Sequence, residues 1–180
     1  MIDILMSLAE ELHIESTKIQ SWIINNEKYS SHVFDDPIRF NAKAERPKSI
    51  RGRRGIYIFV SKKRIPMNRR IVTAWNDVGG AGFNEDYLKN ITSIKEGDCF
   101  YLGSCASEDS GSLYVRIGQH LGNYSGLKLA NPTRVFMKDS LDVIAFPIRK
   151  EYKGYYRIIL TTIEKQLHLI IKPKTGASRV

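Results

Sequence analysis

Five residues combine side-chain types that suit the hydrolysis of a phosphate diester: Tyr57, Tyr101, Arg116, His120 and Glu164. This reaction needs an activated water, groups that neutralise the charge of the pentacoordinate phosphorus, and a stabilised leaving oxygen. A carboxylate can hold a divalent metal, and a guanidinium can hold two phosphate oxygens. A phenol or an imidazole can accept the proton of the water. Together these side chains indicate phosphodiester hydrolysis.

Arg116 and His120 are four residues apart in a helix that the sequence predicts from Ser112, as its N-cap, to about Leu121. This spacing places both side chains on one helix face. Arg116 is expected to stabilise charge in the transition state, because its fork binds phosphate and it stays charged at any working pH. His120 could orient water, act as a base or bind a neighbouring phosphate. The structural alternatives are a surface ion pair for Arg116 and a helix-capping or core-edge histidine at 120.

Glu164 lies in a predicted helix over 155–171 whose apolar face includes Leu160 and Leu167, each about one turn away. A carboxylate that borders an apolar stripe is unfavourable unless it is paired or bound to a metal. Glu164 is therefore the expected ligand of Mg²⁺ or Mn²⁺, with waters and the substrate phosphate completing the coordination. The alternative is a solvated flank of the helix.

Tyr57 and Tyr101 fall in two predicted strands, 55–60 and 99–103. A free phenol has a pKa near 10, so only about 0.1% of it is ionised at neutral pH. Tyr57 is the candidate general base and would need help from a nearby cation or a metal-bound water; residues 62–64 are all basic. Tyr101 could orient the same water or contact the phosphate. Either tyrosine could instead be a plain core residue.

The arrangement of these residues resembles the GIY-YIG nuclease family. The matching motifs are Gly55-Ile56-Tyr57, Tyr101-Leu102-Gly103, the Arg116-x-x-x-His120 helix, and Glu164 in a helix followed by Lys172-Pro173. They occur in the family's order over residues 53–176, about two-thirds of the chain. The resemblance implies a small antiparallel sheet flanked by helices, one divalent metal held by Glu164, and cleavage in one hydrolytic step.

Two features depart from the family pattern. Tyr57 and Tyr101 are 44 positions apart, whereas the family's two tyrosine motifs are usually close together, so residues 61–98 are expected to contain an insertion. The family usually has an asparagine three residues after the proline, and Gly176 stands at that position here.

The charge distribution indicates a polyanionic partner, and we expect DNA. The formal net charge is +9, and residues 51–74 hold eight basic and no acidic side chains. A cluster of this kind is typical of a nucleic-acid footprint, although a basic surface without a specific partner would look similar. The residues expected to contact phosphates are Arg51, Arg53, Arg54, Lys62, Lys63 and Arg64.

Residues 1–50 are expected to form an N-terminal helical segment and a linker. Two short helices predicted within 4–23 resemble a helix-turn-helix, with Ala9 and Ile19 at matching positions but His13 where the turn usually has glycine. The alternative is a pair of helices that simply pack on the main domain. The linker is predicted over 35–54, where polar residues and prolines are frequent.

Residues 51–180 are expected to form the nuclease domain, with its insertion at about 61–98. Further strands are predicted over 69–75 and 141–148, and a glycine-rich loop over 79–82. Short strands followed by helices predict an α/β (α+β) fold: a small central antiparallel sheet flanked by helices, with an N-terminal helical appendage.

The leading hypothesis is a metal-dependent DNA endonuclease of restriction or phage-defence type. The alternatives are a non-catalytic nucleic-acid-binding module and a structure-specific nuclease that acts on branched DNA. Two cysteines cannot form a disulfide framework, Asp3 stands where a secretory signal would be basic, and no apolar run could span a membrane, so we expect a cytoplasmic protein without a membrane partner. Cleavage of both strands needs two active sites or two successive events, so a homodimer is one expected arrangement.

Overall fold

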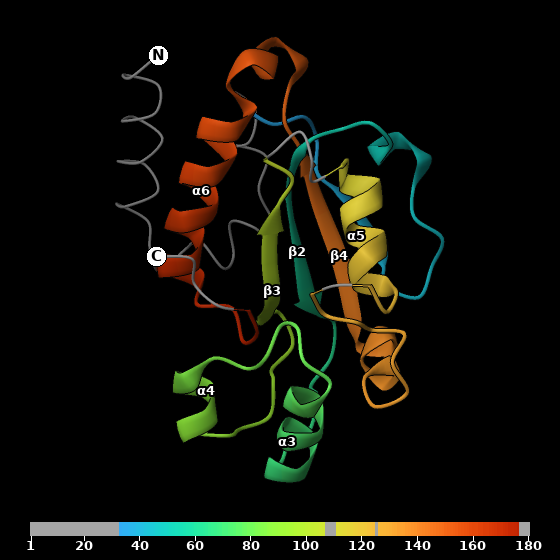
Figure 1. Cartoon of the computed structure of the whole chain (residues 1–180), viewed down its shortest axis with the longest axis vertical. Coiled ribbons are helices and arrows are strands. Elements are labelled where there is room, and N and C mark those ends of the chain that lie inside the picture. Colours follow the sequence, from blue (N-terminus) through green and yellow to red (C-terminus); the bar gives the residue numbers. More distant parts are fainter. Residues whose placement is uncertain (1–32, 107–110, 125, 177–180) are drawn as a thin grey trace.

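The chain folds around one small antiparallel sheet with helices on both faces (Figure 1). The computed structural model describes residues 33–106, 111–124 and 126–176. The predicted N-terminal helices, with their resemblance to a helix-turn-helix, lie outside the described residues. Within the described residues the predicted α+β fold is confirmed.

The sheet has the strand order β1-β4-β2-β3, and all neighbouring strands are antiparallel. The strands are β1 (Ile38–Asn41), β2 (Gly55–Ser61), β3 (Cys99–Ser104) and β4 (Leu141–Pro147). All seven residues of β2 are buried, which explains its nearly continuous apolar sequence. The predicted strands at 55–60, 99–103 and 141–148 are therefore confirmed.

Alternate residues of β2 face two different cores. Ile56 and Ile58 pack against α6 (Tyr156–Ile171), while Tyr57 and Phe59 belong to the core that also contains α5 (Leu113–Leu121). Figure 1 shows the two helices on opposite sides of the sheet. β3 is an edge strand of the sheet, and its unpaired edge lies between α5 and α6.

Both predicted helices begin and end close to the expected residues. Ser112 caps α5, since its hydroxyl oxygen accepts a hydrogen bond from the Val115 amide at 3.4 Å. Helix α6 ends at Ile171, where Lys172 adopts a left-handed conformation and Pro173 follows.

The predicted strand over 69–75 is wrong, because this segment forms helix α3 (Arg69–Asp77). Asn68 caps the helix by accepting a hydrogen bond from the Ile71 amide at 2.9 Å. Val72 and Trp75, three residues apart, form its buried face. The apparent alternation of side chains over 69–75 therefore belongs to a helix with one buried face, not to a strand.

The predicted linker over 35–54 is wrong where residues 38–41 form β1, which pairs with β4. Ile38 and Phe40 pack against the core that contains Tyr57, while Arg39 between them forms an ion pair with Asp142 at 2.9 Å. The sheet therefore takes up residues on the N-terminal side of position 51.

The segment at 61–98, which was predicted to contain an insertion, carries α3 and α4 (Glu85–Lys89) at one end of the sheet (Figure 1). It is joined to the C-terminal part of the chain by an isolated bridge between Phe83 and Thr175. Thr175 also donates its amide to the carbonyl oxygen of Phe100 in β3, at 2.9 Å. No helix among the described residues is long and apolar enough to cross a membrane.

Candidate active site

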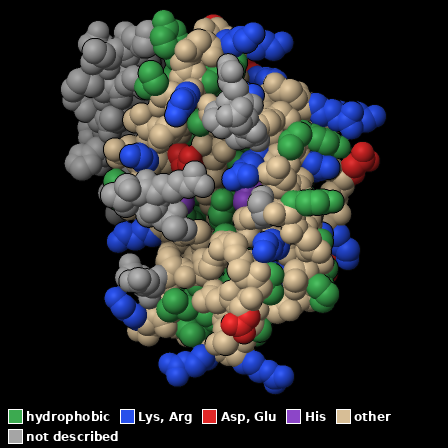
Figure 2. Space-filling view, in the orientation of Figure 1, with side chains coloured by type: hydrophobic (Ala, Val, Ile, Leu, Met, Phe, Trp, Pro, Cys, Tyr) green, Lys and Arg blue, Asp and Glu red, His purple; other side chains and the backbone are tan. Residues whose placement is uncertain are grey.

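A pocket of about 550 Å³ opens along the free edge of β3, between α5 and α6. Both helices, β2, β3 and the loops around residues 80 and 126 contribute to its lining. Figure 2 shows basic, acidic and histidine side chains together near the middle of this face. Four predicted site residues line the pocket: Tyr57, Tyr101, Arg116 and Glu164.

Tyr57 reaches the pocket from the central strand because its neighbour on β3 is a glycine. Tyr57 and Gly103 are register partners, and a Cβ at position 103 would lie 2.6 Å from the Tyr57 hydroxyl oxygen. Any side chain at 103 would therefore occupy the space of the phenol. The ring of Tyr101, two residues before Gly103, is stacked on that of Tyr57, with centroids 6.3 Å apart.

His120 is fully buried behind Tyr57 and does not itself line the pocket. Burial, together with the charge of Arg116, lowers the pKa of His120 to about 3, so the ring is neutral at neutral pH. Its Nδ1 accepts a hydrogen bond from the Leu127 amide at 3.1 Å, which leaves the ring proton on Nε2. Nε2 lies 2.8 Å from the Tyr57 hydroxyl oxygen and therefore donates to it.

The Tyr57 phenol is protonated at neutral pH. Burial raises its pKa well above the ordinary value of 10, and the nearby Tyr101 and Cys105 act in the same direction. Arg116 is the group that lowers this pKa. Since the phenolic oxygen accepts from His120, the Tyr57 proton is available to a ligand in the pocket.

Arg116 faces Tyr57 from α5, and its guanidinium is only partly satisfied by the protein. Nη1 donates to the side-chain oxygen of Gln119 at 2.9 Å. The Nε atom is buried and has no hydrogen-bond partner among the described residues. The Arg116 side chain lines the pocket, so its positive charge would favour an anion bound there.

Glu164 enters the pocket from α6, where the Ser104 hydroxyl donates to its Oε2 at 2.5 Å. No group of three or more His, Cys, Asp or Glu side chains that could hold a metal occurs within the described residues. A single carboxylate nevertheless suits Mg²⁺ or Mn²⁺, because Mg²⁺ is commonly held by one or two carboxylates together with waters and substrate phosphates. The hydroxyls of Ser104 and Thr161 add further oxygen donors beside Glu164.

A charged flank of α6 around Glu164 also lines the pocket, and its other members were not predicted from the sequence. The flank consists of Arg157, Thr161, Glu164, Lys165 and His168. Arg157 and Lys165 are exposed, and neither forms an ion pair with another described residue. The spacing of the five residues repeats every three to four positions, which is the signal that could have revealed a common face beside the apolar one.

The six basic residues predicted to contact phosphates do not line the described pocket. Arg53 forms an ion pair with Asp35, and Arg54 donates to the carbonyl oxygen of Gly111. Both arginines therefore help to fix loops near the start of β2.

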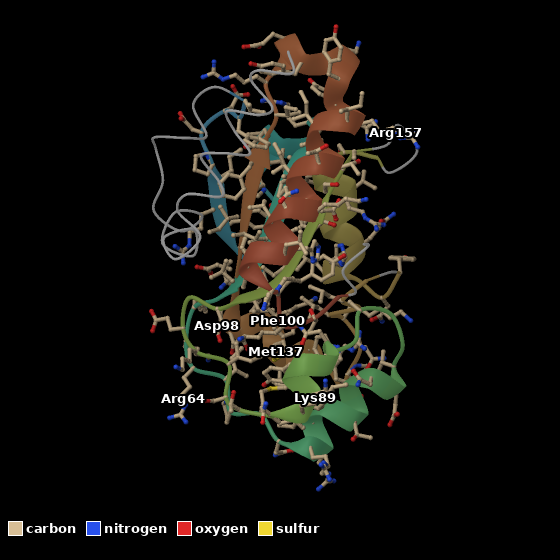
Figure 3. The ribbon with its side chains drawn as sticks, turned by 90° about the vertical axis from the view of Figure 1, so that its left-hand side faces the viewer. Arg64, Lys89, Asp98, Phe100, Met137 and Arg157 are labelled. Atoms are coloured by element: carbon tan, nitrogen blue, oxygen red, sulfur yellow. The ribbon has the colours of Figure 1, made fainter. Side chains whose placement is uncertain are left out.

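The other predicted phosphate ligands lie on the surface. Arg51 stacks on the ring of Tyr114, with its Cζ 4.6 Å from the ring centroid. Residues 62–64 are exposed beyond the end of β2. Figure 3 shows Arg64 towards the opposite end of the molecule from Arg157.

Gly176, at the position where the resemblance predicted an asparagine, lines the pocket next to Tyr101. A Cβ at 176 would lie 3.1 Å from Cε2 of Tyr101, and the backbone has a φ of 93° that side chains rarely adopt. The glycine therefore allows the Tyr101 ring and the C-terminal segment to approach closely.

Comparisons of the chain with protein-family models, with curated proteins and with solved structures found no match. Function is therefore inferred from the geometry of the pocket and from the motifs in the sequence.

Proposed function

We propose that the protein is a metal-dependent endonuclease that hydrolyses phosphodiester bonds in DNA. The observation that carries this proposal is the convergence of the Tyr57 hydroxyl, the Arg116 guanidinium and the Glu164 carboxylate on one pocket. A group for proton transfer, a fixed cation and a hard oxygen ligand are what this hydrolysis requires. The resemblance to the GIY-YIG family supports the choice of DNA as substrate.

Tyr57 orients the attacking water and accepts its proton as the general base. His120 donates to the phenolic oxygen, so it stabilises the phenolate when Tyr57 is ionised. Arg116 acts in the same direction by lowering the phenol pKa. Burial opposes both effects and keeps the phenolate a small fraction at neutral pH, so cleavage becomes faster as the pH rises.

Arg116 binds the phosphate that is cleaved and stabilises the negative charge that grows in the transition state. The hydrogen bond from Nη1 to Gln119 helps to hold the guanidinium in place, so it needs little reorganisation during the reaction. The fork of the guanidinium can hold two equatorial oxygens at once, which a lysine ammonium cannot do.

Glu164 would hold the divalent metal, with the Ser104 hydroxyl fixing the orientation of its carboxylate. A bound Mg²⁺ or Mn²⁺ would supply Lewis-acid stabilisation of phosphate oxygens. The protein contributes one carboxylate here, so binding of the metal and binding of the substrate are expected to strengthen each other.

The α6 flank supports a strand of nucleic acid as the substrate in preference to a single nucleotide. Arg157 and Lys165 are eight residues apart, which is about 12 Å along a helix. This length corresponds to roughly three to four nucleotides at about 3.4 Å each. A strand that runs along α6 can therefore contact both cations through successive phosphates.

A restriction or phage-defence role in the cytoplasm is proposed on the same resemblance. Cutting both strands of a duplex requires two active sites or two successive events, and a homodimer would provide two sites.

A plasmid-nicking assay with and without Mg²⁺ tests the proposal, using the wild type, Glu164→Gln and the matched control Glu151→Gln. The wild type and the control should cut only with Mg²⁺ or Mn²⁺. Glu164→Gln should bind DNA like the wild type but not cut it, because its amide oxygen can still accept from Ser104 while the negative charge is lost.

Three outcomes would contradict this assignment. DNA binding without cleavage in either metal would indicate a non-catalytic nucleic-acid-binding module. Cleavage of junctions but not of linear duplex would indicate a structure-specific nuclease. If Glu164→Gln cut within about tenfold of the wild-type rate, roughly 1.4 kcal/mol in barrier, Glu164 would not be the metal ligand.

A further inference from the structure

A buried arginine, Arg134, stands at the start of a chain of hydrogen bonds that ends at the Tyr57 hydroxyl. Arg134 precedes the short 3-10 helix η4 (Val135–Ser140) and is fully buried. Its Cζ lies 4.1 Å from the centroid of the Trp75 ring. Among the described residues Arg134 forms no ion pair, and its hydrogen bonds go to backbone carbonyls. Burial lowers its pKa to about 10, so it remains protonated at neutral pH.

The Arg134 guanidinium joins the loop after α5 to the last turn of α3 and the loop that follows it. Nη1 donates to the carbonyl oxygen of Leu127 at 2.8 Å, in the loop after α5. Nη2 donates to the carbonyl oxygens of Gly79, at 3.0 Å, and of Trp75, both in the 61–98 segment. Charged hydrogen bonds in a buried site are strong, so Arg134 clamps the two loops together.

A second contact between the same loops lies at the pocket wall. The Ala81 amide donates to the carbonyl oxygen of Gly126 at 2.9 Å, and Gly80 and Gly126 both line the pocket. A Cβ at Gly80 would lie 2.4 Å from that carbonyl oxygen, so the loops approach as closely as their backbones permit.

The clamped loop determines which nitrogen of His120 carries the proton. The Leu127 amide donates to Nδ1, so Nε2 carries the proton and donates to Tyr57. If the Leu127 amide moved away, Nδ1 could be protonated instead, and Nε2 would then accept a hydrogen bond from the phenol. The Tyr57 proton would turn towards His120 and away from the pocket.

We infer that Arg134 is a positioning residue for Tyr57: by tying the 61–98 segment to the Leu127 loop, it fixes the His120 tautomer whose Nε2–H donates to the Tyr57 oxygen and stabilises its phenolate. Residues 61–98 would then help to position the side chains of the active site. The effect on cleavage rests on the proposed function, whereas the effect on the His120 ring does not.

The first test is Arg134→Lys, with Arg149→Lys as a control that also bonds a backbone carbonyl, of Phe34, but away from the pocket. Lysine keeps the charge and offers one nitrogen in place of two. The ¹⁵N signals of the His120 ring report the tautomer directly. The wild type and the control should show protonated Nε2 alone, and Arg134→Lys should show both tautomers. Its kcat should fall about 10- to 100-fold at unchanged KM.

Gly80→Ala provides a second test that leaves Arg134 intact, in case the lysine variant does not fold. Gly52→Ala is the matched control, because Gly52 also has a positive φ (66°) but a Cβ there would meet nothing within 4 Å. Gly80→Ala should separate Ala81 from Gly126 and reproduce the mixed His120 tautomers and the lower kcat, and Gly52→Ala should reproduce neither.

The inference would be overturned if Gly80→Ala, or a folded Arg134→Lys, kept the wild-type His120 signals and a kcat within twofold of the wild type. A wild-type protein with the proton on Nδ1 would also overturn it. If the wild type cut no DNA, the proposed function would fail, and the His120 signals alone would then decide the role of Arg134.

Discussion

Replacement of Tyr57 by phenylalanine separates a catalytic tyrosine from a core residue, because it removes one hydroxyl and leaves the ring. The ring is fully buried, with its centroid 6.3 Å from that of Tyr101 in a stacked pair and 6.3 Å from that of Phe59 in an edge-on pair. These contacts hold the phenylalanine ring where the tyrosine ring was. The change therefore acts on His120 and on the pocket.

The expected loss of stability follows from the buried hydrogen bond. His120 Nε2–H would keep its proton but lose its acceptor 2.8 Å away, and it is shielded from water. A buried donor left without a partner costs about 1–3 kcal/mol, which urea unfolding can measure. The variant should therefore remain folded, with a clearly lower midpoint.

The expected loss of rate follows from the base that is removed. Single-turnover cleavage at saturating protein should slow by about 10²–10⁴, or roughly 2.7–5.4 kcal/mol in barrier. Because the pKa of Tyr57 lies well above 10, the wild-type rate should also rise about tenfold per pH unit from 7 to 9, and the variant should lose this rise. The pKa of a tyrosine in the unfolded chain is near 10, so the phenol is mostly protonated in both the folded and the unfolded state from pH 7 to 9. Tyr57 therefore does not change the unfolding free energy over this range.

Two results would refute this reasoning. If Tyr57→Phe lost the expected stability but cut within twofold of the wild-type rate, Tyr57 would be a core residue. If the wild-type rate were flat between pH 7 and 9, with the variant still slow, Tyr57 would orient the water without taking its proton.

Three further predictions concern charge. Arg116→Lys should slow single-turnover cleavage by about 10²–10³ with little change in Kd, because the fixed guanidinium fork is lost and the charge is kept. A rate equal to that of the wild type would show that the fork does not stabilise the transition state. Arg157→Gln should reduce the salt slope of DNA binding by about one, and Arg64→Gln should not; the reverse result would favour the 51–70 region as the DNA contact. His120 has a pKa of about 3 in the folded protein and about 6.5 when unfolded, so the unfolded state binds more protons below pH 6.5. The unfolding free energy should then fall by about 1.4 kcal/mol per pH unit as the pH drops from 6 to 4, and this slope should be absent in His120→Gln.

Strong local patterns made most of the sheet predictable. Residues 55–60 are a nearly continuous apolar run because β2 is covered on both faces, and Ser112 followed by Leu113 and Ile117 is a clear helix start. The periodic apolar face of α6 likewise stands out in the sequence.

Two elements were misread where local signals were ambiguous. The side chains of residues 69–75 fit both the alternating pattern of a strand and the spacing of a helix face. The cap at Asn68 stabilises the helix. The short β1 has only four residues and follows Pro37, and it becomes a strand through its pairing with β4, a contact about 100 residues away in the sequence. Long-range pairing of this kind leaves little trace in the local sequence.

The candidate site was predictable where motifs fix several positions together, and four of the five predicted catalytic residues line one pocket. The basic residues were harder to rank, because charge counts do not show what each cation contacts. Arg53 and Arg54 bind other parts of the protein, whereas Arg157 and Lys165 are exposed on a flank of α6 and form no ion pair with another described residue.

The attachment of residues 174–176 to the rest of the protein determines when, during synthesis, the pocket becomes complete. During synthesis Tyr57, β3 and Arg116 are made well before α6, so a partial chain lacks the carboxylate of Glu164. The Thr175 side chain, which is made after α6, donates a hydrogen bond to the Phe100 carbonyl across 75 positions. A chain that stops before α6 would therefore carry the sheet but lack Glu164, and under the proposed function it would not cut DNA until residues 156–176 had been made and had docked.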